Sequence, residues 1–281
     1  MGVYSRMVSL AFVAALATQQ PTTLWAAAEE PAAVSPTYAD IVTLADSADL
    51  VIKAQLRKLV RVENERAPGL QAGWGRYYVN ARTRALLTGN SPIGESLTYL
   101  VDLPLDAKGK PPKLKKEEVL IFARPVRGRP GELQLVAPRA QLLWSAPMED
   151  AVRTVLKSLL APEAPPSVTG VREIIHVPGA LAGQGETQIF LTTSDQSAAS
   201  ITVRHQPGSK PAWGVSFSEL VADVGNPPAP DTLEWFRLAC FLPNALPHEA
   251  NLSETAEARR QAAADYAMIL GELGPCRRNR S

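Results

Sequence analysis

The chain has 281 residues, and 29 lysine and arginine residues stand against 28 aspartate and glutamate residues, which gives a formal net charge of +1. Proteins that bind nucleic acid usually carry a basic excess, so this balance argues against nucleic acid as a partner. A chain of this length forms either one large domain or two ordinary ones.

The first 28 residues have the layout of a secretory signal peptide. Arg6 precedes an apolar run from Met7 to Ala17, and three alanines ending at Ala28 precede the first acidic residues. The apolar run is shorter than the roughly 20 residues that span a bilayer, which favours a cleaved signal over a membrane anchor. We expect cleavage after Ala28, with a buried N-terminal helix as the alternative. The mature chain is then expected to be soluble, periplasmic or secreted, and without a transmembrane segment.

The next part of the sequence predicts strands between two helices. A short amphipathic helix is expected within residues 37–48, with Ser35 as its N-cap. Alternation of apolar and polar residues then predicts two long half-buried strands at 50–62 and 77–87. Further strands are expected at 96–103, 117–126 and 132–144, and Pro147 opens a second helix.

Five strands of this kind predict a small closed or partly open β-barrel of the OB type, because such barrels have five strands. A sandwich of similar strand count is the alternative. Three prolines in the segment 161–169 then indicate a linker. The expected organisation is a signal peptide at 1–28, an OB-like barrel domain with flanking helices at 29–160, the proline-rich linker, and an α+β domain at 170–281.

The second domain is expected to contain four strands followed by two helices. The strands are predicted at 170–177, 186–193, 199–206 and 212–221. Asp231 and Ser253 are the expected N-caps of the helices. The whole chain is therefore predicted to be α+β, with mainly antiparallel strands.

Cys240 and Cys276 are the only cysteines in the sequence. An oxidising compartment favours a disulfide between such a pair. The bond would stabilise the fold by about 3–4 kcal/mol in the chain-entropy model. Two free structural thiols or a reactive cysteine are the alternatives. A nucleophilic thiolate needs a nearby base, and nothing in the sequence fixes His248 near Cys240.

Motifs for cofactors and catalysis fail on physical requirements. Gly89–Ser96 matches a phosphate-binding loop except that Glu95 stands in place of the lysine, and its carboxylate would repel phosphate. The signatures of serine hydrolases are absent. We therefore expect no cofactor.

The three histidines offer no local metal-binding motif. His176, His205 and His248 each lack a second histidine or a cysteine at the short spacing that such motifs use. His176 and His205 lie on separate predicted strands that could be neighbours, so a shared site stays open. The favoured interpretation is hydrogen-bonded imidazoles and no metal site.

Aromatic and basic side chains gather near the start of the strand predicted at 77–87. Tyrosine, tryptophan and arginine are the residue types that anchor protein interfaces. The possible interaction surface consists of Trp74, Arg76, Tyr77, Tyr78, Arg82 and Arg84. The alternative places Tyr77 in the core, with Trp74 covering one end of the barrel.

Residues 36–145 resemble the OB-like barrel of netrin-type or tissue-inhibitor-like modules. The resemblance rests on "ADLVIKAQLRKLVRVE", "YYVNARTRALLTG" and "EEVLIFAR". The sequence lacks the N-terminal cysteines that carry metalloprotease inhibition in the animal inhibitors, so the resemblance does not imply inhibition here. The segments "GETQIFL" and "LEWFRLACFLP" resemble uncharacterised exported proteins of Gram-negative bacteria, which implies no activity.

Two functional hypotheses follow. The first is a non-catalytic exported binding or interaction protein, whose partner is a protein or another component of the cell envelope. The second is a hydrolase of unrecognised type that uses His176 or His205 with a carboxylate such as Glu219. The first is favoured because each catalytic motif fails.

Overall fold

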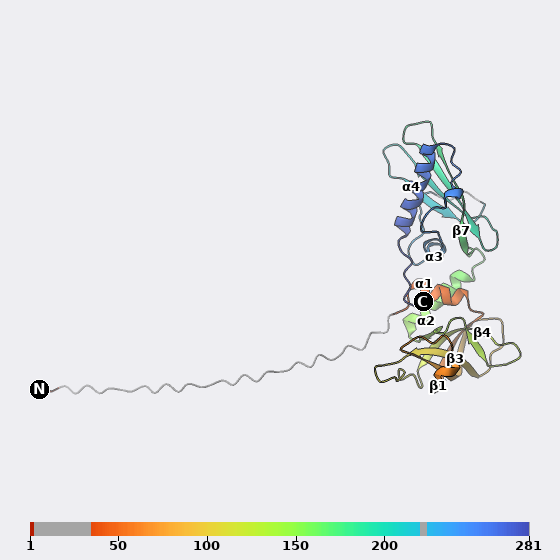
Figure 1. Cartoon of the computed structure of the whole chain (residues 1–281), viewed down its shortest axis with the longest axis vertical. Helices are drawn as coiled ribbons and strands as arrows, with labels where there is room; N and C mark the ends of the chain where they lie inside the picture. The colour runs from red at the N-terminus through yellow and green to blue at the C-terminus, as the bar shows by residue number, and fades with distance from the viewer. Residues whose placement is uncertain (3–34, 220–223, 281) are drawn as a thin grey trace. The chain divides into compact units, whose positions relative to one another are not determined.

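The computed structural model describes residues 1–2, 35–219 and 224–280. Apart from its first two residues, the expected signal peptide lies outside these ranges. Residues 35–281 form one compact unit, which holds two separate β-sheets and four α-helices among its described residues (Figure 1). None of the helices in the described ranges is long and apolar enough to cross a membrane.

The first sheet has six antiparallel strands. They are β1 (Leu50–Arg61), β2 (Trp74–Thr88), β3 (Ser96–Pro104), β4 (Glu118–Pro125), β5 (Leu133–Leu135) and β6 (Gln141–Leu143). Their order is β3-β2-β1-β4-β5, with β6 paired to β4 beside β5. Alternate residues of β2, such as Tyr77, Val79 and Ala81, are buried, because successive side chains of a strand point to opposite faces.

The sheet is not closed into a barrel, so the predicted OB-like barrel is wrong. Its two end strands, β3 and β5, form no ladder with each other, and the isolated bridge between Thr98 and Glu132 lies just before β5. The physical reason lies in the segment 132–144, which is not one strand. It turns at Ala137–Ala140, where Pro138 has no N–H to donate to a ladder. The two short strands that remain both pair with β4.

The second sheet is a four-stranded antiparallel meander in the order β10-β9-β8-β7. Its strands are β7 (Val168–Pro178), β8 (Gly185–Thr193), β9 (Ser200–His205) and β10 (Ala212–Ser216). All four predicted strands are therefore present, although β10 ends earlier than expected. The mixed α+β class with mainly antiparallel strands is confirmed.

The helices are α1 (Tyr38–Asp46), α2 (Ala146–Leu159), α3 (Leu233–Ala239) and α4 (Ala256–Leu273), and short 3-10 turns occupy Asn64–Arg66 and His248–Ala250. Helices α1, α3 and α4 begin slightly later than expected, and α2 begins one residue before Pro147. The N-caps of α1, α3 and α4 are Thr37, Thr232 and Thr255, in place of the expected Ser35, Asp231 and Ser253. Each threonine hydroxyl accepts the N–H of the third residue after it, which is the contact that an N-cap requires.

Helices α1, α2 and α3 pack against one another. Arg237 on α3 is only 4% exposed, and its guanidinium donates hydrogen bonds to the Asp46 carboxylate and to the Pro165 carbonyl. Pro165 lies in the segment between α2 and β7, where the linker was expected. The division into two domains stays a prediction.

The predicted disulfide between Cys240 and Cys276 is confirmed. Cys240 is the C-cap of α3, and Cys276 lies just after the end of α4. The bond therefore fixes the end of α3 to the end of the last helix, and both sulfurs are used structurally. It leaves no thiol for nucleophilic chemistry.

Replacing both cysteines by serine is expected to lower the free energy of unfolding by about 3–4 kcal/mol, because the open chain regains loop entropy. The bond closes a sequence separation of 36. Urea unfolding with and without dithiothreitol measures the effect. The wild type should lose stability on reduction and the double variant should not respond. A wild-type stability that reduction leaves unchanged contradicts the prediction.

Candidate metal centre

The second sheet brings His176 and His205 to the same face. His176 on β7 pairs with Thr187 on β8, and His205 on β9 pairs with Gly185 on β8. Paired residues of antiparallel strands point to the same side, and residues 185 and 187 also share a side because they are two apart. The two imidazoles therefore flank β8 on one face, in adjacent rows of the sheet.

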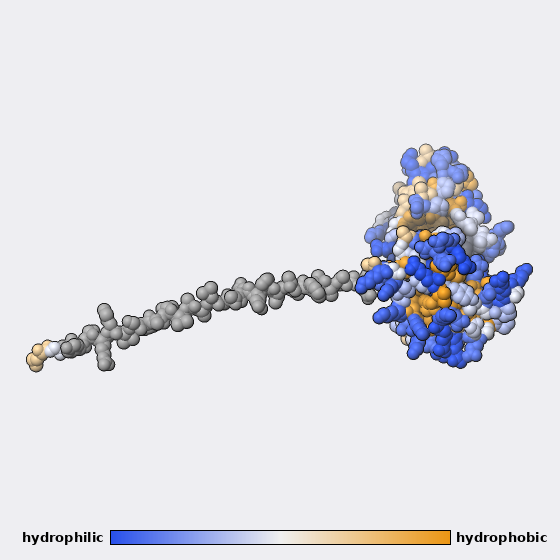
Figure 2. Space-filling view, turned by 60° about the horizontal axis from the view of Figure 1, so that its bottom comes forward, coloured by the Kyte–Doolittle hydropathy of each residue, from blue (hydrophilic) through white to orange (hydrophobic). Residues whose placement is uncertain are grey.

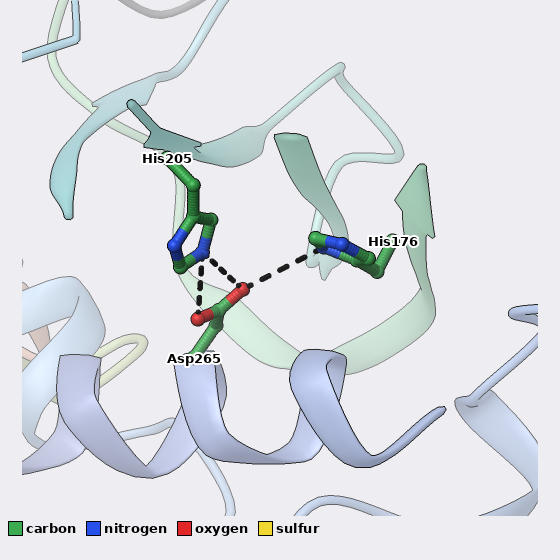
Figure 3. A group of neighbouring side chains, drawn as sticks. All are labelled: His176, His205 and Asp265. Carbon is green, nitrogen blue, oxygen red and sulfur yellow. Dashed lines mark hydrogen bonds and ion pairs between the residues drawn. The ribbon is translucent and has the colours of Figure 1, made fainter. Parts of the chain in front are cut away.

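Helix α4 supplies a carboxylate to this face. Asp265 is 2% exposed and points from α4 between the two imidazole rings (Figure 3). His205 Nε2 lies 3.0 Å from each Asp265 oxygen. Gln261, one helical turn earlier, donates to Oδ1 at 2.9 Å, and the Thr187 hydroxyl donates to Oδ2. The carboxylate is thus held from three sides, which a buried charge requires.

The hydrogen bonds of Thr187 fix the state of His176. The Thr187 hydroxyl has one hydrogen, and it goes to Asp265, so the contact of 2.8 Å between His176 Nδ1 and Thr187 Oγ1 needs the proton on Nδ1. The backbone N–H of His176 donates to the Ser253 hydroxyl. Burial lowers the pKa of His176, a nearby Asp265 raises it and His205 lowers it, with a net decrease. Neutral imidazole is therefore favoured.

Gly185 leaves the space that the His176 ring occupies. A Cβ atom at residue 185 would lie 2.8 Å from Cε1 and 2.9 Å from Nε2 of His176. It would also lie 3.1 Å from the carbonyl oxygen of Val177. The position of His176 therefore depends on the absence of a side chain at residue 185.

The donor atoms of His176, His205 and Asp265 lie within 4.8 Å of one another. A tetrahedral zinc ion has donors about 2.0–2.2 Å away, and hence about 3.4 Å from each other. The distances from Asp265 to His205 Nε2 and to His176 Nδ1, 3.0 and 4.0 Å, lie on either side of that value. Binding requires the Nδ1 proton of His176 to leave, and the donors that are farthest apart, at up to 4.8 Å, have to approach each other by about 1.4 Å. The three donors fit a metal ion on these terms.

A cavity of about 370 Å³ lies beside the cluster. Its walls are the hairpin loop 178–184, both histidines and the first turns of α4, including Glu257 and Gln261. The side chains of His176 and His205 are 8% and 15% exposed, so the cluster is shielded yet reaches the cavity. Three protein donors beside a cavity leave coordination positions for water or another small ligand.

The sequence showed only part of this cluster. A site shared by His176 and His205 stayed open there, but Asp265 was missed and no metal site was expected. Asp265 lies on the buried stripe of α4 beside Tyr266, and an acidic residue in such a stripe was the available signal. Glu219, the carboxylate suggested for a hydrolase, is exposed after β10 and does not line the cavity. His248 lies in a 3-10 turn and is not one of the three clustered donors.

The predicted interaction surface lies on the first sheet, and its residues divide between two faces. Tyr77 is 4% exposed and belongs to the core, as the alternative interpretation had it. The other five residues, Trp74, Arg76, Tyr78, Arg82 and Arg84, occupy alternate positions of β2 on its outward face, where Trp74 and Arg76 are half-buried and the other three are exposed. Their role in binding a partner stays a prediction.

One row of exposed apolar side chains crosses this outward face. Tyr78 pairs with Val60 on β1 and with Leu100 on β3, and the three are 45%, 44% and 47% exposed. Figure 2 shows, for one face of the protein, that hydrophobic residues reach the surface among hydrophilic ones.

Comparison with known proteins gives no family assignment. No family model matches the chain, and no curated protein is significantly similar to it. The resemblance to netrin-type modules therefore stays a prediction, and the function has to be argued from the site itself.

Replacing Gly185 by alanine is expected to displace the His176 ring and to lower the free energy of unfolding by about 1–3 kcal/mol, because the added methyl overpacks the site. Gly170→Ala is the matched control on β7, since a Cβ there meets nothing within 4 Å. Chemical denaturation and the NMR signals of the histidine ring protons measure the two effects. Equal behaviour of the two variants contradicts the prediction.

Proposed function

We propose that the protein is an exported, non-catalytic binding protein that holds one divalent transition-metal ion between His176, His205 and Asp265. The observation that carries the proposal is the convergence of two imidazoles and one carboxylate from three separate elements within 4.8 Å. The sequence suggested a binding protein without a ligand, and the proposed ligand is this metal ion.

The donor set selects the class of metal. Two nitrogen donors and one oxygen donor suit zinc, copper, nickel or cobalt, whereas calcium and magnesium prefer sites made of oxygen. Thr187 and Gln261 support the proposal because they already orient the Asp265 carboxylate. Metal sites commonly have such outer partners, which hold a ligand in its binding orientation.

Export is supported by two further observations. The N-terminal sequence has the layout of a signal peptide, and the Cys240–Cys276 disulfide is a bond that persists in oxidising compartments such as the periplasm. Neither observation identifies a protein partner, so we limit the proposal to a metal-binding protein of the cell envelope or the exterior.

A hydrolase is the second candidate, and one observation favours it. His205 is paired with the buried Asp265 and reaches the cavity, which is how a carboxylate orients a histidine that acts as a general base. Thr187, the hydroxyl nearest to this pair, is fully buried and already bonded to Asp265. A water molecule would therefore have to act as the nucleophile. This candidate predicts that His205→Ala no longer turns over a substrate.

Zinc titration of chelator-treated protein is expected to show one ion per chain. His176→Ala, His205→Ala and Asp265→Asn should each weaken binding by more than the ~10–100-fold that outer-shell changes cost, since each removes a donor. Isothermal titration calorimetry measures the affinity, and the visible spectrum of bound cobalt reports nitrogen and oxygen coordination.

His248→Ala is the matched control, because it removes the remaining histidine outside the cluster and should leave the affinity unchanged. A metal present at 100 times its Kd should also stabilise the wild type by about 2.7 kcal/mol. Zinc binding that is equally tight in the wild type and in Asp265→Asn would overturn the proposal. Circular dichroism of each variant separates a lost donor from a lost fold.

A further inference from the structure

A second cavity lies at the first sheet, apart from the histidine cluster. It has a volume of about 250 Å³ and shares no lining residue with the cavity beside the histidines. Its apolar walls include Leu44 of α1, Trp74 of β2 and Pro138, and its charged walls are Asp102, Arg139 and Arg280. Trp74 is one of the residues that the sequence indicated as an interaction surface.

Two guanidinium groups line this cavity. The Arg139 guanidinium lies over the indole of Trp74, with its central carbon 4.6 Å from the ring centroid, which is a favourable cation–π arrangement. Arg280 is fixed by two hydrogen bonds from Nη2, to the carbonyl oxygens of Arg139 and Gln141. Among the described residues, neither arginine forms an ion pair with a carboxylate.

The nearby carboxylates are already engaged. Both oxygens of Asp102 accept hydrogen bonds from Arg76, at 2.7 and 2.9 Å. The Asp40 carboxylate accepts backbone N–H groups from Thr37, Asn279 and Arg280. The cavity therefore contains one neutralised ion pair and two further positive charges.

The positive charge is partly buried, which makes it costly without an anion. Burial lowers the pKa of Arg280, Asp40 raises it and Arg139 lowers it, with a net decrease. The two guanidinium groups thus lie close enough to repel each other. A bound anion would offset both the repulsion and the loss of hydration.

We propose that this cavity binds a small organic acid, with its carboxylate between Arg139 and Arg280 and its apolar body against Trp74, Leu44 and Pro138. Both hydrogen bonds that the Arg280 side chain makes among the described residues come from Nη2. Because the N–H groups of Nε and Nη1 point in different directions, Arg280 can give the carboxylate one of these donors. The Arg139 side chain makes no hydrogen bond among the described residues, so its planar guanidinium can match the carboxylate with two parallel hydrogen bonds. The site is independent of the proposed metal centre.

Benzoate is the probe, and benzamide is its neutral counterpart of the same shape. Calorimetric titration is expected to show one benzoate per chain, bound at least 10-fold more tightly than benzamide. Inorganic phosphate, an anion without an apolar body, should also bind more weakly than benzoate. Arg139→Gln and Arg280→Gln should each weaken benzoate binding at least 10-fold, because each removes hydrogen bonds to a charged group.

Two exposed arginines give matched controls. Arg127→Gln and Arg278→Gln remove the same charge close by in the sequence, at residues that do not line this cavity, and should leave benzoate binding unchanged. Arg139→Gln decides the matter if Arg280→Gln unfolds, since no hydrogen bond of the described structure uses the Arg139 side chain. Absence of benzoate binding, equal binding of benzamide, tighter binding of phosphate, or equal loss in the control variants overturns the proposal.

Discussion

The buried carboxylate of Asp265 is the constraint on which the second half of the structure depends. An ionised carboxylate removed from water is costly unless donors surround it. Asp265 meets that requirement with groups from α4, β8 and β9, which are Gln261, Thr187 and His205. These bonds fix the rotation of α4 about its axis and its position along the sheet. A rotation of the helix in either direction would leave the buried carboxylate of Asp265 without hydrogen-bond partners. The same bonds hold the carboxylate where His176 and His205 also converge.

The alternation of side chains along β8 determines where His176 lies in the site. Gly185 and Thr187 lie two residues apart on β8, so one face presents a gap followed by a hydroxyl. The gap admits the ring of His176, and the hydroxyl links that ring to Asp265. A shift of one residue in the pairing of β7 with β8 would turn His176 to the opposite face. The edge of β7 is held in turn by Ser253 and by the backbone N–H of Leu252, so the backbone of this strand is bonded on both sides at this point.

Sequence periodicity predicted most strands, the α+β class and the disulfide, because these follow from local alternation and from the presence of only two cysteines. The prediction of a barrel failed because closure depends on a long-range pairing between β3 and β5, and the segment expected to be one strand turns at Ala137–Ala140. The predicted N-cap residues were wrong where two polar residues lie close together before a helix and either could cap it. Ser253 looked like an N-cap, yet its hydroxyl accepts the His176 N–H, and Thr255 caps α4. The site was missed because its members are far apart in the sequence, with a separation of 60 positions from His205 to Asp265. Rules based on ligand spacing find only local motifs.

The parts of the metal centre differ in how firmly they are anchored, and this bears on how an ion would enter. Asp265 lies in the middle of α4, whose C-terminal end is fixed by the Cys240–Cys276 bond and by the hydrogen bond from Trp235 to the Leu273 carbonyl. His205 ends β9 and contacts that fixed carboxylate directly. His176, by contrast, precedes the exposed hairpin loop 178–184, which forms a wall of the cavity. An ion arriving through the cavity would therefore meet His205 and Asp265 already in place. The ring of His176 would have to lose its Nδ1 proton and its bond with Thr187, and to move toward the other two donors.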